Sequence, residues 1–552
     1  MKDIILKYCL QNAVFYKGKA NPKAVLGKVM AELPKARKDV PRVKKLIDET
    51  IKTVNKLSPE EQLKRLEKID PKLTHREAKV QEELPALPDV KGKVVTRFAP
   101  APTGPLNIGH MLRAVMLSYL YAEKYKGKFI VRFEDTDARS LKREYYDWIK
   151  EDLKNTGVKP NKIYRESQHM GLFYKHAEKL IKDGDMYVCF CSAEEFRRLK
   201  QEKRDCPCRG KKAEENLKDW KEMLKGKYKE GEAVVIFKTS MQDPNPAMRD
   251  HACLRINETS HPFTKDKHRV WPLYNFANVI MDHNDKITHV FRGKEHEHNT
   301  QMQRKLFKAL KWKPPVVVNF GMIYLSGEKL HTRDIKEKIN RGELTGWDDV
   351  RLHTVRALLR RGFQAEAFKG ASLACGLSKN DIRFDWDILE STNRKVLDPR
   401  ANRYMVVTNP VKISVRNAPN IHSVFEPLHI EFPERGKKRI PVNLKRIYIE
   451  KSDYRNLNRK EFRLKGLFNL RLGGNIGVYT NNEIKRSMPK IHWVSEGYVK
   501  VSILMPSGET IAGIAEPEVK KLKVGDVLQM ERFGFGRVDK KGKEITIVFA
   551  HR

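Results

Sequence analysis

Two stretches of the sequence combine residue types that could do chemistry. The first, RFAPAPTGPLNIGH, runs from Arg97 to His110, between the strand-like run KVVTRF and an apolar run with helical spacing. Its glycines let the backbone approach a ligand, and the N–H groups at a helix N-terminus favour phosphate. Asn107 and His110 lie three residues apart, on one face of the first helical turn. The stretch predicts a nucleotide site in which both side chains stabilise phosphate charge; the alternative is a strand–helix turn with a capping histidine.

The second stretch, CFCSAEEFRRLKQEKRDCPC, carries two C-x-C pairs. Such pairs can converge on a tetrahedral metal ion, and four thiolates favour Zn²⁺. A closed site of this kind has no open position, so its role would be structural. The alternative is a set of reduced thiols in an ordinary insertion. The predicted ligands are Cys189, Cys191, Cys206 and Cys208.

The composition points to a polyanionic partner. Lys and Arg total 110 and Asp and Glu total 70 in 552 residues, a net charge of +40, which favours nucleic acid over a merely soluble basic surface. No signal peptide or membrane-length apolar run is visible, and seven cysteines in so long a chain do not make a disulfide scaffold. We therefore expect a soluble, reduced, cytoplasmic protein.

The order of strand-like and helical segments predicts an α/β multidomain protein. We expect a helical N-terminal extension over residues 1–88 and a catalytic domain with a Rossmann-type parallel sheet over 89–345, because strand and helix patterns alternate there. Residues 185–270 interrupt the alternation as an insertion. A helical region over 346–404 follows, and short strands with hairpin turns predict one or two β-barrels over 405–552.

The chain resembles the class I aminoacyl-tRNA synthetases, whose HIGH motif stands here as NIGH. RFAPAPTGPLNIGH, KFIVRFEDTD and WPLYNFANVIMDHNDKITHVFRGKEH are similar to the glutamyl-tRNA synthetases, whereas glutaminyl enzymes typically carry PPEPNG and DDTN. FDWDILESTNRKVLDPRANRYMVV, EFRLKGLFNLRL and KIHWV resemble the archaeal branch, with its β-barrel anticodon-binding end. The resemblance covers nearly everything from about residue 91 to the C-terminus.

The resemblance implies a pocket for glutamate. Arginine suits a carboxylate because its planar guanidinium can bond it through two N–H groups. Arg97 and Arg292 would bind the side-chain carboxylate and Glu134 the ammonium group, although Arg97 and Glu134 could also simply pair. Ala101 stands where the family often has a serine, so one hydroxyl contact is missing or comes from another group. The full predicted set is Arg97, Ala101, Glu134, Tyr274, Asn278 and Arg292.

ATP would lie along the NIGH helix, where Asn107 replaces the first histidine of the motif. The predicted ATP-binding residues are Ala99, Pro100, Thr103, Gly104, Gly109 and His110. The second family motif, KMSKS, has no clean match in YLSGEKLHTRDI, and Asp334 aligns with its catalytic lysine. In one interpretation Lys329, Arg333 or Lys336 supplies the cation instead; in the other, this copy is weakened or specialised. The predicted catalytic residues are Asn107, His110, Lys329 and Arg333.

The implied reaction is ATP-dependent formation of glutamyl-adenylate, aided by Mg²⁺, followed by transfer to tRNA(Glu); charging of tRNA(Gln) is a further possibility. The insertion would hold the acceptor stem, the arginines of VRALLRRGF would follow the inner side of the tRNA, and the barrels would meet the anticodon. A monomer is the default. The alternatives are a glutaminyl enzyme, a synthetase-like tRNA-binding protein that has lost catalysis, and an enzyme that glutamylates a tRNA base.

Overall fold

The computed structural model describes residues 1–15, 18–33, 39–70, 73, 83–324 and 332–552. The chain divides into two compact units, Met1–Lys79 and Val80–Arg552. Within the described ranges, no helix combines the length and apolar character needed to cross a membrane.

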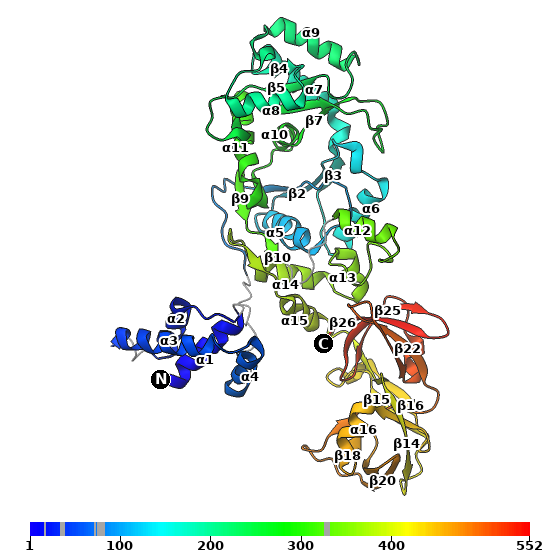
Figure 1. Cartoon of the computed structure of the whole chain (residues 1–552). Coiled ribbons are helices and arrows are strands. Elements are labelled where there is room, and N and C mark those ends of the chain that lie inside the picture. Colours follow the sequence, from blue (N-terminus) through cyan, green and yellow to red (C-terminus); the bar gives the residue numbers. More distant parts are fainter. Residues whose placement is uncertain (16–17, 34–38, 71–72, 74–82, 325–331) are drawn as a thin grey trace. The chain divides into compact units, whose positions relative to one another are not determined.

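The first unit is a small helical body with its own core (Figure 1). Asn, Asp and Ser side chains accept hydrogen bonds from N–H groups in the first turns of the second, third and fourth helices, which start these helices at defined residues. On the third helix Val43, Ile47, Ile51 and Val54 are buried, one turn apart, as expected for an amphipathic helix. The helices are α1 (Lys2–Phe15), α2 (Pro22–Glu32), α3 (Val40–Val54) and α4 (Pro59–Ile69).

The second unit contains the predicted Rossmann-type parallel sheet, and this prediction is confirmed. Its two parallel pieces have the orders β1-β2-β3 and β8-β9. They meet where the Thr288 N–H donates to the Val95 carbonyl at 2.9 Å, so β1 and β8 are neighbours. The strands are β1 (Val95–Phe98), β2 (Lys128–Phe133), β3 (Lys162–Arg165), β8 (His289–Gly293) and β9 (Val316–Phe320). Their carboxyl ends carry Arg97, Glu134 and Arg292 to one edge of the sheet.

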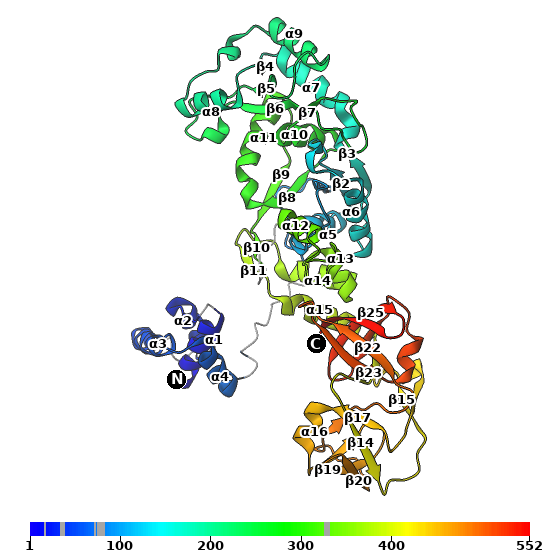
Figure 2. The same ribbon diagram turned by 45° about the vertical axis from the view of Figure 1, so that its right-hand side comes forward.

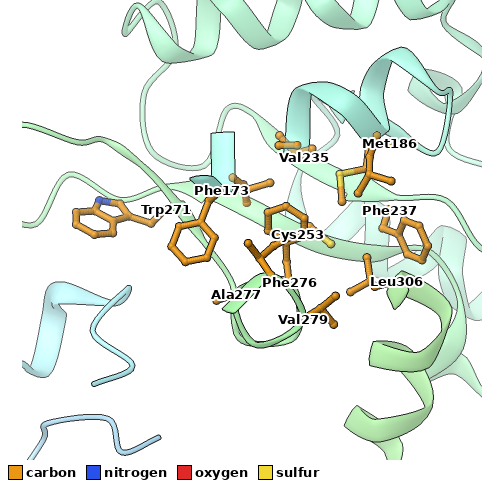
Figure 3. Close-up of a cluster of buried hydrophobic side chains, with 14 of the residues drawn as sticks. Phe173, Met186, Val235, Phe237, Cys253, Trp271, Phe276, Ala277, Val279 and Leu306 are labelled. Carbon is orange, nitrogen blue, oxygen red and sulfur yellow. The ribbon is translucent and has the colours of Figure 1, made fainter. Parts of the chain in front are cut away.

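The region predicted as an insertion shares a hydrophobic core with its host. Its antiparallel sheet has the order β4-β5-β6-β7, and that sheet packs on helices of the catalytic part rather than on a separate core. Phe237 and Cys253 of the inserted sheet lie beside Phe276 and Leu306 of the catalytic helices (Figure 3). The elements are β4 (Met186–Cys189), β5 (Val234–Phe237), β6 (His251–Ile256), β7 (Val270–Pro272), α7 (Met170–Lys182), α8 (Ala193–Glu202), α9 (Ala213–Leu224), α10 (Tyr274–Asn284) and α11 (Glu297–Ala309).

The helical region after the sheet closes the catalytic part and joins it to the barrels. Arg360 pairs with Asp539 at 2.8 Å, and the buried Arg361 donates to the Ala550 carbonyl at 2.7 Å. These two arginines, expected along the tRNA, instead fasten a helix to the last strands of the chain. Helical spacing identifies a charged face but not the partner that covers it. The elements of this region are β10 (Ile323–Tyr324), α12 (Thr332–Asn340), α13 (Val355–Arg361), α14 (Ala365–Cys375), β11 (Ile382–Arg383) and α15 (Trp386–Leu397), whereas α5 (Met116–Lys124) and α6 (Arg143–Asn155) connect the first three strands of the parallel sheet.

The C-terminal part has two barrel-like sheets, each with its own core (Figure 2). One has the order β12-β24-β25-β26-β22-β23-β13, so both edge strands, β12 and β13, come from the start of this part of the chain and the strands between them come from its end. The other has the order β17-β14-β20-β19-β18-β21. Phe468 and Trp493 are fully buried in the second core, so neither ring is open to an RNA base. The elements are β12 (Asn402–Tyr404), β13 (Val406–Val407), β14 (Pro410–Arg416), β15 (Ser423–Pro427), β16 (Lys437–Pro441), β17 (Ile447–Glu450), α16 (Lys451–Leu457), β18 (Glu461–Leu464), β19 (Asn469–Gly473), β20 (Ile476–Asn481), β21 (Lys490–Ile491), β22 (Val499–Leu504), β23 (Thr510–Ala515), β24 (Val527–Met530), β25 (Gly534–Lys541) and β26 (Ile545–His551).

Candidate active site

A cleft of about 1000 Å³ opens beside the carboxyl end of β1. One wall is the stretch that follows this strand, and the opposite wall is formed by α12 and the segment from Leu344 to Thr354. This volume lies in the range of small-molecule sites. Every residue predicted to bind ATP lines the cleft: Ala99, Pro100, Thr103, Gly104, Gly109 and His110.

The NIGH turn opens directly into a π-helical segment, His110–Val115, before α5 continues as an ordinary helix. Such segments are rare and frequently occur at functional sites. The Asn107 side-chain oxygen accepts the His110 backbone N–H at 2.8 Å. Because this oxygen caps the helix, the NH₂ group is the part of Asn107 that can donate to a ligand in the cleft.

The His110 side chain is open to the cleft, and its pKa is lowered because the surrounding protein removes water from the ring. The ordinary pKa of histidine already lies below 7, so the ring is neutral at physiological pH. His110 can therefore donate a hydrogen bond to a phosphate.

Two cations line the cleft, Lys338 of α12 and Arg351, and the two faces of α12 line different spaces. Thr332, Ile335 and Lys338, at helical spacing, line the cleft, whereas Lys336 lines a separate pocket on the other side of the helix. Arg333 does not line the cleft; its side chain is 87% exposed and its Nε lies 3.0 Å from the Glu337 carboxylate. Lys329 lies outside the described residues.

Sequence reasoning missed Lys338. The spacing i, i+3, i+6 from Thr332 would have indicated it once the start of α12 was known. Without a KMSKS match, nothing in the sequence marks the residue at which α12 begins.

Three of the residues predicted to bind glutamate, Arg97, Glu134 and Asn278, form a hydrogen-bonded network next to the cleft. The Asn278 side-chain oxygen accepts bonds from Arg97 and Arg132, both at 3.0 Å, and its NH₂ donates to Glu134 at 2.6 Å. The Glu134 backbone N–H in turn donates to the Pro100 carbonyl at 2.9 Å, which ties the network to the cleft wall. Asn278 is thus the residue that holds two cations and one carboxylate in a fixed arrangement.

Arg292 differs from the other arginines of the network. Its Nη1 donates to Gln303 at 3.0 Å, but Nε and Nη2 have no hydrogen-bond partner among the described residues, although the residue is 5% exposed. Desolvation lowers its pKa, so the protein alone does not fully stabilise the charge. A guanidinium with two buried donors left over suits a carboxylate ligand. Tyr274 is half-buried close by, with a pKa raised by desolvation and then by Glu134, and Ala101 lies on the cleft wall.

Three buried charges that the sequence analysis did not assign support this pocket from behind. Arg132 lies 2.9 Å from Asp282 and 3.0 Å from Glu166, and Arg97 lies 3.2 Å from Asp282. Burial alone would raise the pKa of Asp282, but Arg97 and Arg132 outweigh it and hold that pKa below its ordinary value. Burial raises the pKa of Glu166. These residues come from separate elements, so no local motif indicates their association.

The predicted metal ligands also come together. The Sγ atoms of Cys189, Cys191, Cys206 and Cys208 all lie within 4.8 Å of one another. A Zn²⁺ ion with four bonds of about 2.3 Å needs sulfur–sulfur distances of about 3.8 Å. Cys206 is closest to the others, with Cys189 and Cys191 at 3.3 and 3.4 Å, and the hydrogen bond from Cys189 lowers its pKa to about 5. The donor set fits a structural zinc ion.

Comparison with known proteins gives full-length relatives. The glutamate--tRNA ligases of Pyrococcus furiosus and Pyrococcus abyssi are 42% and 43% identical to this chain, each over 100% of both sequences. A crystal structure of a glutamate tRNA ligase from Elizabethkingia meningosepticum matches with a TM-score of 0.41 at 22% identity, over 56% of this chain and 70% of that one, a likeness too loose to support an argument.

Family models divide the chain into three matched regions. Residues 93–399 match the catalytic domain of the class I tRNA synthetases (E and Q), and residues 401–488 and 490–539 match two anti-codon binding domains of the same group. The first match covers more than half of the chain, and the cleft, the NIGH turn and the arginine network all lie within it. The chain therefore belongs to the class I tRNA synthetases of the E and Q group.

Proposed function

We propose that this chain is a glutamate--tRNA ligase, which joins L-glutamate to tRNA(Glu) in two ATP-dependent steps. The observation that carries the proposal is the arginine network beside the nucleotide cleft. Arg97 and Arg292 offer charge to a side-chain carboxylate, and Glu134 offers a partner for an ammonium group. A neutral glutamine side chain would leave the buried donors of Arg292 without a charged acceptor. The names of the relatives support the same substrate.

In the first step the α-carboxylate of glutamate attacks the α-phosphorus of ATP, pyrophosphate leaves, and glutamyl-adenylate forms. In the second step the 2′-OH of the terminal tRNA adenosine attacks the acyl carbon and AMP leaves. Asn107 and His110 donate hydrogen bonds to the phosphates, and Lys338 supplies the cation from α12. Arg97, Arg292, Glu134, Tyr274 and Asn278 orient the amino acid, so the protein mainly positions the reactants. Mg²⁺ bound with ATP would neutralise triphosphate charge.

Zinc in the cysteine cluster would be structural. The four thiolates would cross-link β4 to the segment around Cys206 and Cys208, which follows α8. This fixes the fold of the inserted region, which would grip the acceptor end of the tRNA. Because that region shares its core with α10 and α11, holding it rigid also supports the pocket wall.

The remaining assignments extend the same proposal. The boundaries 1–88, 89–345, 346–404 and 405–552, with an insertion at 185–270, would separate the N-terminal extension, the catalytic domain, the stem-contact region and the anticodon-binding domain. We propose a cytoplasmic monomer. Charging of tRNA(Gln) with glutamate is a second activity that the pocket permits, since it depends on the anticodon contacts and not on the amino acid.

An aminoacylation matrix tests the proposal. Purified protein would be given tRNA(Glu) or tRNA(Gln), each with glutamate or glutamine. We expect charging of tRNA(Glu) with glutamate and none with glutamine on either tRNA. Charging with glutamine would identify a glutaminyl enzyme, and tRNA binding without ATP consumption would identify a chain that has lost catalysis.

A further inference from the structure

A second pocket, of about 460 Å³, lies behind the cleft, on the opposite side of α12. It is lined by aromatic side chains and by cations. Trp347 also lines the cleft, Lys336 is one of the alternative cations named from the sequence, and Arg356 belongs to the stretch expected along the tRNA. Tyr145 and Trp148 of α6 and Trp347 provide the aromatic surfaces. Lys142, Lys336 and Arg356 provide the charge. Proteins bind nucleotides with these two kinds of side chain: an aromatic ring stacks on the base, and a cation contacts the phosphate.

The three aromatic rings are tilted or edge-on to one another and do not stack face to face. The ring centres of Tyr145 and Trp148 are 5.3 Å apart with a tilt of 52°, and those of Tyr145 and Trp347 are 6.4 Å apart at 80°. Tyr145 is buried, whereas both tryptophans are half-buried and keep part of their surface toward the pocket. A base can therefore lie against one ring and meet the edge of another.

The three cations of the pocket lie close to the Tyr145 and Trp148 rings. The Lys336 and Lys142 ammonium groups lie 5.1 and 5.8 Å from the centre of the Tyr145 ring, and the Arg356 guanidinium lies 5.2 Å from that of Trp148. Lys336 has no carboxylate partner among the described residues, and desolvation followed by repulsion from Lys142 lowers its pKa. Two lysines that repel each other across a pocket gain from an anion placed between them.

Two carboxylates also line the pocket, Glu144 and Asp348, so its positive charge is partly compensated; Asp348 lies 3.6 Å from Arg360. Lys142 meets Glu144 only at 3.9 Å, with both side chains exposed, which is a weak pair. Arg356 is bound to Glu151 at 2.8 Å, so it is positioned over Trp148 rather than free to move. The anion would therefore be held mainly by Lys142 and Lys336.

We propose that this pocket binds a single nucleotide of the bound tRNA, with its base against Trp148 and Trp347 and its phosphate between Lys142 and Lys336. The source of the nucleotide rests on the proposed function, since the chain is strongly basic and belongs to an RNA-binding family. The pocket and the ATP cleft share the Trp347 side chain but lie on different faces of α12: Lys336 and Ile339 line the pocket, while Ile335 and Lys338 line the cleft.

The test uses the full chain and a tRNA(Glu) transcript. The variants are Trp148→Ala, Trp148→Phe and the double variant Lys142→Ala/Lys336→Ala. The control is Lys150→Ala, an exposed lysine of α6 that pairs with Asp147 and does not line the pocket. We expect Trp148→Ala to raise the KM for tRNA roughly fivefold to a hundredfold, the effect of losing one stacked base, and Trp148→Phe to restore most of it.

The double lysine variant should also raise the KM for tRNA and flatten the dependence of log Kd on log salt by about 0.7–0.9, one phosphate contact. The KM for ATP should stay within twofold, because these side chains do not reach the cleft. Since both lysines lie at the surface of the pocket, this variant tests the proposal even if Trp148→Ala fails to fold.

Equilibrium dialysis with AMP distinguishes the sources of the nucleotide. A second AMP site in the wild type that disappears in the double lysine variant, with an unchanged KM for tRNA, would overturn the RNA source. If the variants at Trp148, Lys142 and Lys336 matched Lys150→Ala in both the KM for tRNA and AMP binding, the pocket would bind no nucleotide and the proposal would be wrong. If the wild type charges no tRNA with glutamate, the proposed function fails, but tRNA binding by the variants still decides the nucleotide pocket.

Discussion

Replacing Arg292 by methionine should separate substrate recognition from folding. In the free protein this guanidinium is buried with two N–H positions unpartnered, while its Nη1 donates to Gln303 at 3.0 Å. A glutamate side chain would satisfy the unpartnered donors. We therefore expect Arg292→Met to lose affinity for glutamate without losing stability.

The magnitude follows from the contacts. Truncating one partner of a buried, hydrogen-bonded charge pair costs about 2–5 kcal/mol, which is roughly a 30- to 4,000-fold loss in kcat/KM for glutamate. Each buried unsatisfied polar group costs about 1–3 kcal/mol. The variant removes two such groups and leaves the Gln303 oxygen as a new one. The free protein should therefore gain about 1–3 kcal/mol in its free energy of unfolding.

Two measurements check this prediction. Glutamate-dependent ATP–pyrophosphate exchange in the presence of tRNA gives kcat/KM, and thermal unfolding without ligands gives the stability. Arg304→Met is the matched control, because Arg304 is an exposed arginine of α11. If Arg292→Met unfolded more easily and kept its kcat/KM for glutamate, Arg292 would be a structural residue. The assignment of Arg292 to the glutamate side-chain carboxylate would then be wrong.

Further predictions concern the metal, the cleft cation and a buried carboxyl. Purified protein should contain about one zinc ion per chain; Cys206→Ser should lose it and melt at a lower temperature, whereas Cys375→Ser, outside the cluster, should keep it. Lys338→Ala should lower kcat/KM for ATP roughly tenfold to a hundredfold and Arg333→Ala less than threefold; the reverse order would return the phosphate contact to Arg333. Burial raises the pKa of Asp152 to about 7, so its contribution to stability is present at low pH and is lost as pH rises through 7; Asp152→Asn should flatten the dependence of the melting temperature on pH between 4 and 7, and an unchanged profile would contradict the shifted pKa.

The parts of the site that lie within one continuous motif could be predicted from the sequence. The nucleotide stretch has its strand, turn and helix in immediate succession, so spacing alone places Asn107 and His110 at the cleft. The four cysteines lie within one short segment, and their convergence follows from the C-x-C spacing. In both cases the chain between the residues is too short to take them far apart.

Long-range associations could not be predicted in this way. Arg132, Glu166 and Asp282 lie on different elements, and only the folded sheet brings their charges within 3.0 Å. Arg361 shows the converse error: its place in a basic helical pattern suggested an RNA contact, but the last strand of the chain buries it. The spacing of charged and apolar residues shows which face of a helix is polar, but it does not show which other element of the protein covers that face.

Helix α12 shows why register matters more than composition at this site. Its residues turn by about 100° each, so cations two positions apart point to opposite sides. Lys338 lines the ATP cleft and Lys336 lines the aromatic pocket, so neither can replace the other without a rotation of the helix. Asp334 lines neither pocket, whereas Lys338, one helical turn later, lines the cleft. In the proposed mechanism Lys338 therefore takes the place of the missing KMSKS lysine, and the absence of that motif is compatible with catalysis.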